Sequence, residues 1–402
     1  MGKWEKKELG EITNVVGGGT PKTAIPEYWN GDIIWLSPVD LPPIGVISKV
    51  NNSAKKITQL GLDKSSAKLL PKGTVVYSSR ASIGKIGITE NEICTNQGFT
   101  NFICEDKVYN YFLAYALKNF NKKIEELSNS TTFKEVSKSA IKKFKIPLPP
   151  LNTQKQIVSK LDALFARIDK SIGLLEGNIQ HTKDLMASVL DGEFGLINNE
   201  ELVIKKLGEI CILNPKKSEV KDFLKDTNLV SFLPMSDLNE KQISFIPKQS
   251  KPLSQVYKGY TYFKDGDVLL AKVTPSFENG KAGIAKNLEN GVGFGTSEIH
   301  ILRPKTNVLS EWIYFAISTK EFLKKGELNL TGASGLKRVP KNIIEEHKIP
   351  VPTIEEQKEK IERIKTIQLK LRQTADKQSE KLKYLQSLKS SLLDMAFKGD
   401  LV

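Results

Sequence analysis

The chain of 402 residues has little of the chemistry that builds disulfide scaffolds or metal centres, since it contains only three cysteines and three histidines. The cysteines are odd in number and lack metal-ligand spacing, which favours a reduced cytosolic protein over a disulfide scaffold. The histidines are scattered, so no zinc cluster can be assembled from neighbouring positions. These residues are Cys94, Cys104, Cys211, His181, His300 and His347.

Long apolar runs are also missing. The first residues, Met1 to Lys7, have no apolar core of a signal peptide, and no run approaches the roughly 18 apolar residues of a membrane span. We therefore expect a cytoplasmic protein without a membrane partner.

Motifs for catalysis or cofactor binding are absent too. The stretch 17–22, Gly-Gly-Gly-Thr-Pro-Lys, lacks the Gly-Lys-Ser/Thr ending of a phosphate-binding loop and favours a tight turn or a backbone approach to DNA phosphate. Residues 291–295 lack the strand-to-helix context of a dinucleotide fingerprint and are expected to form a loop. The Asn/Asp-Pro-Pro-aromatic signature of amino-methyltransferases does not occur. We expect no catalytic residue and no cofactor in this chain.

Basic residues, by contrast, are abundant. Lys and Arg outnumber Asp and Glu by 60 to 46, which gives a formal charge of +14 and a pI near 9.3. This excess favours a polyanionic partner such as nucleic acid. The length fits two domains of about 150 residues each with connecting helices.

An internal repeat supports that division. Residues 146–157 resemble residues 349–360, and at the same offset of 203 Lys134 falls on Lys337 and Val136 on Val339. Earlier parts match only after small shifts, so each half is a variable globular part followed by a helix of constant length. The boundaries predicted from the repeat are 1–150 and 196–352 for the globular parts, and 151–195 and 353–402 for the helices.

Both helical segments carry a heptad seam. Apolar residues step by three and four positions, with Thr182, Gln368 and Gln378 as polar interruptions. Thr353 with Glu356 forms a capping box, Asn152 is the expected cap of the first helix, and glycines 192 and 399 are expected stop signals. Two equal seams in one chain most simply pair with each other as antiparallel helices. The seams comprise Leu161, Phe165, Ile168, Ile172, Leu175, Ile179, Met186 and Val189 in the first copy, and Ile361, Ile364, Leu371, Ala375, Leu382, Leu385 and Leu392 in the second.

The globular parts read as short strands separated by Gly and Pro turns, with one helix each. The predicted strands are 33–36, 73–77, 86–88 and 100–103 in the first half and 266–271, 283–285 and 299–302 in the second, with helices near 109–119 and 310–325. We expect α/β (α+β) units with irregular, mostly antiparallel sheets.

Two segments of the first half suit base contacts. Arg80 and Lys85 can bind guanine edges or phosphates, while Asn96 and Gln97 can bond adenine. A surface ion pair for Arg80, or a turn-stabilising role for Asn96 and Gln97, remains an alternative. The candidate DNA-contacting residues of both halves are Thr20, Ser78, Ser79, Arg80, Lys85, Asn96, Gln97, Lys134, Lys272, Thr274, Lys281, Ser297, Lys337 and Arg338.

Taken as a set, several motifs resemble the specificity subunit of type I restriction-modification systems over essentially the full length. They are Trp4, residues 7–12, 18–21, 28–29, 31–35, 79–84 and 95–99, the proline motif 147–151 with Gln154, and the ending 396–401. The second half departs from the pattern at the positions that correspond to 79–84 and 95–99.

The resemblance implies two target-recognition domains, each reading half of a split, asymmetric DNA sequence. It implies that two antiparallel coiled-coil helices separate them in a pseudo-twofold arrangement and set the spacer. It also implies docking of two methyltransferase subunits that bind S-adenosylmethionine, and of restriction subunits that act as translocases with ATP and magnesium. The alternatives are a self-contained DNA-modifying enzyme with a cryptic site and a coiled-coil protein-interaction scaffold.

Overall fold

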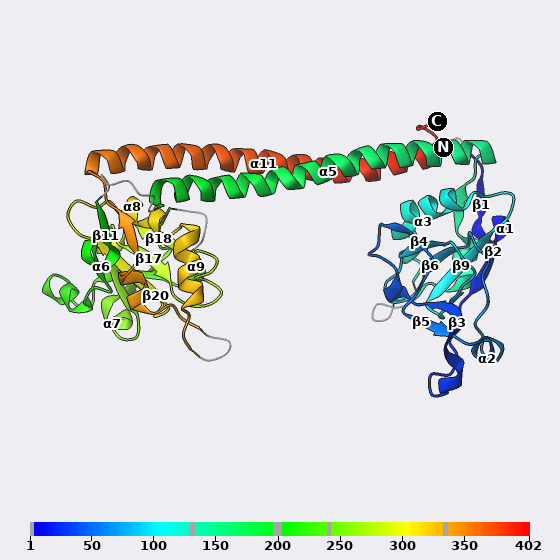
Figure 1. The fold of residues 1–402 in the computed structure, drawn as a ribbon, viewed down its shortest axis with the longest axis horizontal. Helices are drawn as coiled ribbons and strands as arrows, with labels where there is room; N and C mark the ends of the chain where they lie inside the picture. The colour runs from blue at the N-terminus through cyan, green and yellow to red at the C-terminus, as the bar shows by residue number, and fades with distance from the viewer. Residues whose placement is uncertain (1–3, 129–133, 196–202, 239–242, 333–336) are drawn as a thin grey trace. The chain divides into compact units, whose positions relative to one another are not determined.

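The computed structural model describes residues 4–128, 134–195, 203–238, 243–332 and 337–402 (Figure 1). The chain divides into two compact units. Unit 1 contains residues 1–176 and 380–402, and unit 2 contains residues 177–379. The two long helices therefore each contribute residues to both units. The predicted division into segments 1–150, 151–195, 196–352 and 353–402 is based on the sequence repeat and not on these contacts. It stays a prediction.

Unit 1 is built on a five-stranded sheet with the order β2-β9-β6-β7-β4 and a three-stranded sheet with the order β5-β3-β8. Strand β4 pairs parallel with β7, and β3 pairs parallel with β8, whereas the other neighbours are antiparallel. The strands are β2 (Thr13–Gly17), β3 (Trp29–Leu36), β4 (Ile47–Val50), β5 (Lys55–Ile57), β6 (Val75–Ser78), β7 (Ile86–Thr89), β8 (Cys94–Thr95) and β9 (Phe99–Cys104).

A small two-stranded sheet and short helices complete unit 1. The chain start, β1 (Lys6–Glu8), pairs with β10 (Lys145–Pro147), which directly precedes the first long helix. Helix α3 packs on β6 and β7 of the larger sheet (Figure 1). The helices are α1 (Leu9–Ile12), η1 (Pro26–Tyr28), η2 (Pro38–Asp40), α2 (Gln59–Asp63), α3 (Asn110–Glu125) and α4 (Lys138–Lys143).

Unit 2 repeats this topology with one more strand, β16, in its smaller sheet. Its larger sheet has the order β12-β20-β17-β18-β14, its smaller sheet has the order β15-β13-β19-β16, and β11 pairs with β21. The strands are β11 (Ile204–Lys206), β12 (Cys211–Leu213), β13 (Leu229–Leu233), β14 (Ser244–Phe245), β15 (Gln249–Pro252), β16 (Thr261–Lys264), β17 (Val268–Ala271), β18 (Ala282–Ala285), β19 (Val292–Gly295), β20 (Ile299–Pro304) and β21 (Lys348–Pro350). The helices are α6 (Leu207–Ile210), η3 (Lys217–Asp222), η4 (Met235–Asp237), α7 (Leu253–Val256), η5 (Glu289–Gly291), α8 (Ser310–Ala316), α9 (Lys320–Leu328) and α10 (Lys341–Glu345). The predicted α/β (α+β) class is confirmed.

Two predicted elements of unit 2 are wrong. The helix expected over 310–325 is two helices, α8 and α9, because Thr319 begins a new one: its hydroxyl accepts a hydrogen bond from the amide of Phe322 at 3.3 Å. The segment 291–295 is not a loop, because residues 292–295 form a strand and Gly291 ends the helix η5. Strand β19 is buried between β13 and β16, and a side chain at Gly293 would collide with the Phe263 ring.

The long helices are α5 (Leu151–Phe194) and α11 (Ile354–Lys398), and their seams pair antiparallel within each unit. In unit 1 the start of α5, with Leu161 and Phe165, shares a core with Phe397 near the end of α11. In unit 2 the end of α5 shares a core with Ile361 and Ile364 near the start of α11. The predicted antiparallel pairing of the two seams is therefore confirmed in each unit.

Two of the polar interruptions of the seam meet each other. The hydroxyl of Thr182 lies 3.3 Å from the side-chain oxygen of Gln378, within unit 2. Thr182 also donates to its own helix, at the carbonyl of Asn178. A polar position in an apolar seam costs less when its partner across the seam is polar too, and such pairs specify the register of a coiled coil.

The predicted helix ends are half right. Thr353 and Glu356 form the capping box that begins α11, and Gly399, with φ of +93°, follows its last residue. Asn152, however, lies inside the first turn of α5, because Pro150 holds the position that corresponds to Thr353. Gly192 is also wrong as a stop, since α5 continues to Phe194, whose side chain is buried in the core of unit 2.

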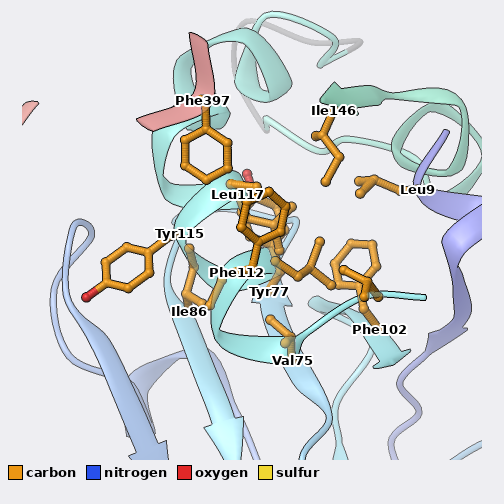
Figure 2. Close-up of a cluster of buried hydrophobic side chains, with 14 of the residues drawn as sticks. Leu9, Val75, Tyr77, Ile86, Phe102, Phe112, Tyr115, Leu117, Ile146 and Phe397 are labelled. Carbon is orange, nitrogen blue, oxygen red and sulfur yellow. The ribbon is translucent and has the colours of Figure 1, made fainter. Parts of the chain in front are cut away.

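Aromatic packing joins the end of the chain to the core of unit 1. Figure 2 shows Phe397 of α11 above Phe112 of α3, and their ring centroids are 5.1 Å apart. Below them lie Val75 and Tyr77 of β6 and Phe102 of β9, all fully buried. Tyr115 extends from the cluster and donates a 2.5 Å hydrogen bond to Asp162 of α5. The core thus includes the sheet, α3 and both long helices.

A buried glutamine ties each long helix to its unit. Gln154 is fully buried; its oxygen accepts from the amide of Tyr109 at 2.8 Å, and its nitrogen donates to the carbonyls of Lys107 and Pro149. In unit 2 the fully buried Gln357 repeats these bonds, accepting from Leu309 and donating to Asn307 and Pro352. Each glutamine connects the beginning of a long helix to the beginning of the helix on the sheet.

We predict that Gln154→Leu destabilises unit 1 by about 3 kcal/mol or more, because three buried backbone groups lose their partners. Hydrogen exchange of peptides from α3 should then accelerate on the order of 100-fold. The matched control is Gln156→Leu, at an exposed position of the same helical turn, which should leave exchange unchanged. Equal protection in the two variants would contradict the role of Gln154.

We also predict that acid destabilises unit 2 through His347. Burial, and secondarily the charge of Lys325, lowers the pKa of His347 from 6.5 to about 4. A neutral imidazole favoured in the folded state stabilises unit 2 above pH 6.5, and this contribution is lost as pH falls toward 4. The loss should reach about 3 kcal/mol. Thermal unfolding of His347→Gln between pH 7 and 4 should show a shallower pH dependence, whereas His181→Gln, at an exposed position, should behave like the parent chain.

Candidate nucleic-acid interface

Three segments of unit 1 meet in what we call the junction: residues 79–81 after β6, residues 96–98 before β9, and residues 134–136. Backbone hydrogen bonds hold it together. The amide of Ser79 donates to the carbonyl of Gly98 at 2.8 Å, and the 134–136 segment exchanges two further backbone bonds with residues 79 and 81, of 2.9 and 3.0 Å. These loops carry most of the residues predicted for the first half.

Unit 2 builds the same junction from residues 272–274, 296–298 and 337–339. The amide of Lys272 donates to the carbonyl of Glu298 at 3.0 Å, and the 337–339 segment exchanges two backbone bonds with residues 272 and 274, of 2.8 and 3.1 Å. Because the bonds are all between backbone groups, they place no demand on the side chains. The junction can therefore present different residues at equivalent positions.

The loop before the last sheet strand is shaped in both units by its own side chain. In unit 1 the oxygen of Asn96 accepts from the amide of Gly98 at 2.9 Å. In unit 2 the hydroxyl of Thr296 accepts from the amide of Glu298 at 3.2 Å. Asn96 therefore has the turn-stabilising role that the sequence left open, while the following residue, Gln97 or Ser297, is exposed.

Each junction displays an arginine paired with a glutamate. In unit 1 the guanidinium of Arg80 lies 3.5 Å from Glu135, and both side chains are about half exposed. In unit 2 Arg338 binds Glu298 through two nitrogens, at 2.9 and 3.0 Å. The guanidinium lowers the pKa of Glu298, with the hydrogen bond as its main cause. Both arginine side chains remain partly exposed, at 49% for Arg80 and 42% for Arg338.

Three residues of unit 1 that were predicted to contact DNA form hydrogen bonds within the unit. The ammonium of Lys85 donates to the carbonyls of Pro38 and Leu41, at 2.7 and 3.1 Å. Ser78 is fully buried and its hydroxyl accepts from the amide of Lys85, while the buried Ser79 accepts from Thr100. These side chains therefore stabilise the backbone around the junction.

The glycine-rich stretch packs against the chain itself. A side chain at Gly18 would meet the carbonyl of Asn96, and one at Gly19 would meet the backbone of Ala67. The predicted residue Thr20, which follows, donates its hydroxyl to the side-chain oxygen of Gln97. Gly18 and Thr20 therefore pack against the loop of the junction that contains Asn96 and Gln97.

The remaining predicted residues lie on or next to the junctions. Lys134 pairs with Glu125 at 2.7 Å. The hydroxyl of Thr274 accepts from the amide of Lys337, which is exposed. Lys272 and Lys281 are half-buried at the two ends of the loop that connects β17 and β18.

Sequence reasoning missed the acidic partners, Glu135 and Glu298. A signal existed for the first: at the offset of 203, Glu135 falls on Arg338, so the repeat places opposite charges at equivalent positions. Glu298 becomes a partner of Arg338 only through folding.

The described part of the chain holds no group of three or more His, Cys, Asp or Glu residues that could bind a metal ion. Among the same residues, no helix combines the length and the apolar character that crossing a bilayer requires.

Comparison with known proteins identifies a family. The model of the type I restriction modification DNA specificity domain matches residues 1–176 and again residues 199–384. The two matches together cover most of the chain, and each contains one junction.

Individual relatives carry consistent names. The chain is 37% identical over 178 residues to the type I restriction enzyme MjaIX specificity subunit of Methanocaldococcus jannaschii, and 43% identical over 152 residues to the EcoEI specificity subunit of Escherichia coli. These matches cover 43% and 38% of this chain, and 41% and 25% of those relatives. A putative MjaX specificity subunit from M. jannaschii is 25% identical over 94% of this chain and 91% of its own.

Solved structures share the fold. A chain from a study of complex assembly and conformational transition of the type I R-M system aligns with a TM-score of 0.75, at 21% identity, over 99% of this chain and 98% of its own. The HsdS subunit from Thermoanaerobacter tengcongensis aligns with a TM-score of 0.61, at 20% identity, over 99% of this chain and 97% of its own.

Proposed function

This chain belongs to the type I restriction-modification DNA specificity family, and from that premise we propose that it directs such a complex to one bipartite, asymmetric DNA sequence. Each unit reads one half of the site, and the chain contributes recognition rather than catalysis. The single observation that carries this proposal is the pair of junctions, which share their backbone bonds and differ in their side chains.

The side chains at equivalent positions support two different half-sites. At the end of the central strand, Arg80 in unit 1 corresponds to Val273 in unit 2, and Gln97 in the next loop corresponds to Ser297. In the 134–136 segment, Glu135 corresponds to Arg338. Arg recognises guanine and Gln recognises adenine through paired hydrogen bonds. Val273 is buried and presents no side chain to a base.

We assign the residues accordingly. Arg80, Gln97, Ser297 and Arg338 are exposed enough to reach base edges. Six further residues support them from within the fold. The four lysines other than Lys85 contact phosphates, and these contacts contribute affinity and its salt dependence. The supporting residues are Thr20, Ser78, Ser79, Lys85, Asn96 and Thr274, and the phosphate-contacting residues are Lys134, Lys272, Lys281 and Lys337.

The long helices are proposed to set the spacer between the half-sites and to dock the partner proteins. Each helix is continuous and carries residues of both units, so its length is set by covalent structure. In this proposal residues 1–150 and 196–352 are the target-recognition domains, and 151–195 and 353–402 are the helices between them.

The proposed partners supply the chemistry. They are double-stranded DNA, two methyltransferase subunits that bind S-adenosylmethionine, and restriction subunits that use ATP and magnesium for translocation. The complex is proposed to work in the cytoplasm, where its DNA substrate is found.

Mapping methylated adenines in cells that carry the intact system tests the proposal. We expect a bipartite, asymmetric motif, and Arg80→Ala should relax it at one half only. Loss of a bidentate base contact removes about 1–3 kcal/mol of discrimination at one position.

Arg338→Ala is the matched control and should relax the other half. Uniform weakening by Arg80→Ala on all sequences would show a phosphate contact instead. A continuous, undivided motif in the parent strain would refute the bipartite reading.

Lengthening the helix pair should lengthen the spacer. One heptad inserted after Ile179 in α5 and one after Ser379 in α11 preserves the seam and adds about 10 Å to the pair. That length corresponds to about three base pairs. We expect the methylated motif to keep both half-sites with a longer spacer. An unchanged spacer with full methylation would contradict the role of the helices.

A further inference from the structure

Val39 is the most exposed large apolar side chain among the described residues, with 84% of its surface accessible. A single exposed valine on a protein surface needs no explanation by itself. The exposure of Val39 does have an explanation, which lies in its position on the short helix η2 (Pro38–Asp40).

The turn that presents Val39 is rigid. The backbone amide and the hydroxyl of Ser37 both donate to the carboxylate of Asp40, at 2.8 and 2.7 Å, and the amide of Ala54 donates to its other oxygen at 3.0 Å. Leu41, directly after the turn, is buried in the core. Val39 is therefore held outward, because its neighbours on both sides are anchored.

The same turn is attached to the junction of unit 1. The ammonium of Lys85 binds the carbonyls of Pro38 and Leu41, on either side of Val39. The amide of Asn96 donates to the carbonyl of Leu36 at 2.9 Å, and a side chain on Gly98 would lie 3.4 Å from the Pro38 ring. Val39 thus projects next to the loop that carries Gln97.

Unit 2 presents a different residue from an equivalent turn. There η4 follows Leu233, whose carbonyl accepts from Thr296 as that of Leu36 accepts from Asn96. The backbone bond from residue 40 to residue 37, of 3.0 Å, recurs from residue 237 to residue 234 at 3.1 Å. The exposed residue in the place of Val39 is Ser236. The turn is thus another position where a shared backbone displays different side chains.

We infer that Val39 contacts the 5-methyl group of a thymine in the half-site read by unit 1. This inference rests on the proposed function and adds a specificity-determining residue to it. The methyl group is the one apolar feature that a base displays in the major groove, and apolar side chains distinguish thymine by contact with it. Arg80 and Gln97 contact polar base edges, whereas Val39 adds the apolar contact that a hydroxyl at Ser236 does not provide.

The test compares thymine with deoxyuridine, which lacks only the methyl group. The full chain, assembled with its methyltransferase subunits, is titrated with duplexes in which each thymine of the site is replaced in turn. For the parent chain, one replacement in the half-site of unit 1 should weaken binding about 3- to 5-fold, the effect of one buried methyl group. Val39→Ser should bind the thymine and deoxyuridine duplexes equally.

Ser236→Val is the matched control and should keep the sensitivity of the first half-site. The inference is overturned if no thymine of that half-site is sensitive, or if Val39→Ser keeps the sensitivity of the parent. Loss of sequence-specific binding by the parent chain would instead refute the proposed function, so the two failures are distinct. Because Val39 is exposed, both variants should unfold at the temperature of the parent, which a thermal scan checks.

Discussion

The rest of the structure depends on one buried side-chain amide in each unit. Gln154 and Gln357 use their oxygen and both N–H groups on backbone partners, so each satisfies three groups that would otherwise be buried without a hydrogen bond. Each glutamine lies where a long helix begins and binds the start of the helix that packs on the sheet. The direction of the long helix is thereby coupled to the sheet, and through the sheet to the loops of the junction. An apolar residue of similar size could fill the space but could not satisfy the backbone.

The junctions combine a backbone that is the same in both units with side chains that differ. Their hydrogen bonds run between backbone groups and recur in both units, while the side chains differ in charge, size and polarity. The turn that carries Val39 or Ser236 follows the same rule. A backbone-built scaffold can accept new side chains at little cost in stability, which suits the proposal that the two units read different half-sites. Residues such as Lys85 and Ser78 contribute to that stability, because their side chains form hydrogen bonds with the scaffold.

Each junction holds an arginine beside a glutamate. Arg338 uses two of its five N–H donors on Glu298, and 42% of its side-chain surface stays accessible. The pair holds the guanidinium in one orientation, which would lower the entropy lost in the proposed contact with a base. The neighbouring carboxylate also repels phosphate, so a misplaced duplex is disfavoured. Arg80 and Glu135 make the same kind of pair with looser geometry.

The sequence by itself determined the repeat, the heptad seams, the capping box at Thr353 and most of the strands, because these depend on residues near one another in the chain. It misplaced the cap at Asn152 and the stop at Gly192, since a proline at position 150 and the buried Phe194 override those local signals. Only the tertiary structure decided which of the candidate DNA-contacting side chains form hydrogen bonds within the chain and which stay exposed. The bonds of Lys85 to Pro38 and Leu41, and of Arg338 to Glu298, join residues about 40 positions or more apart, and such contacts form only when the sheet brings the loops together.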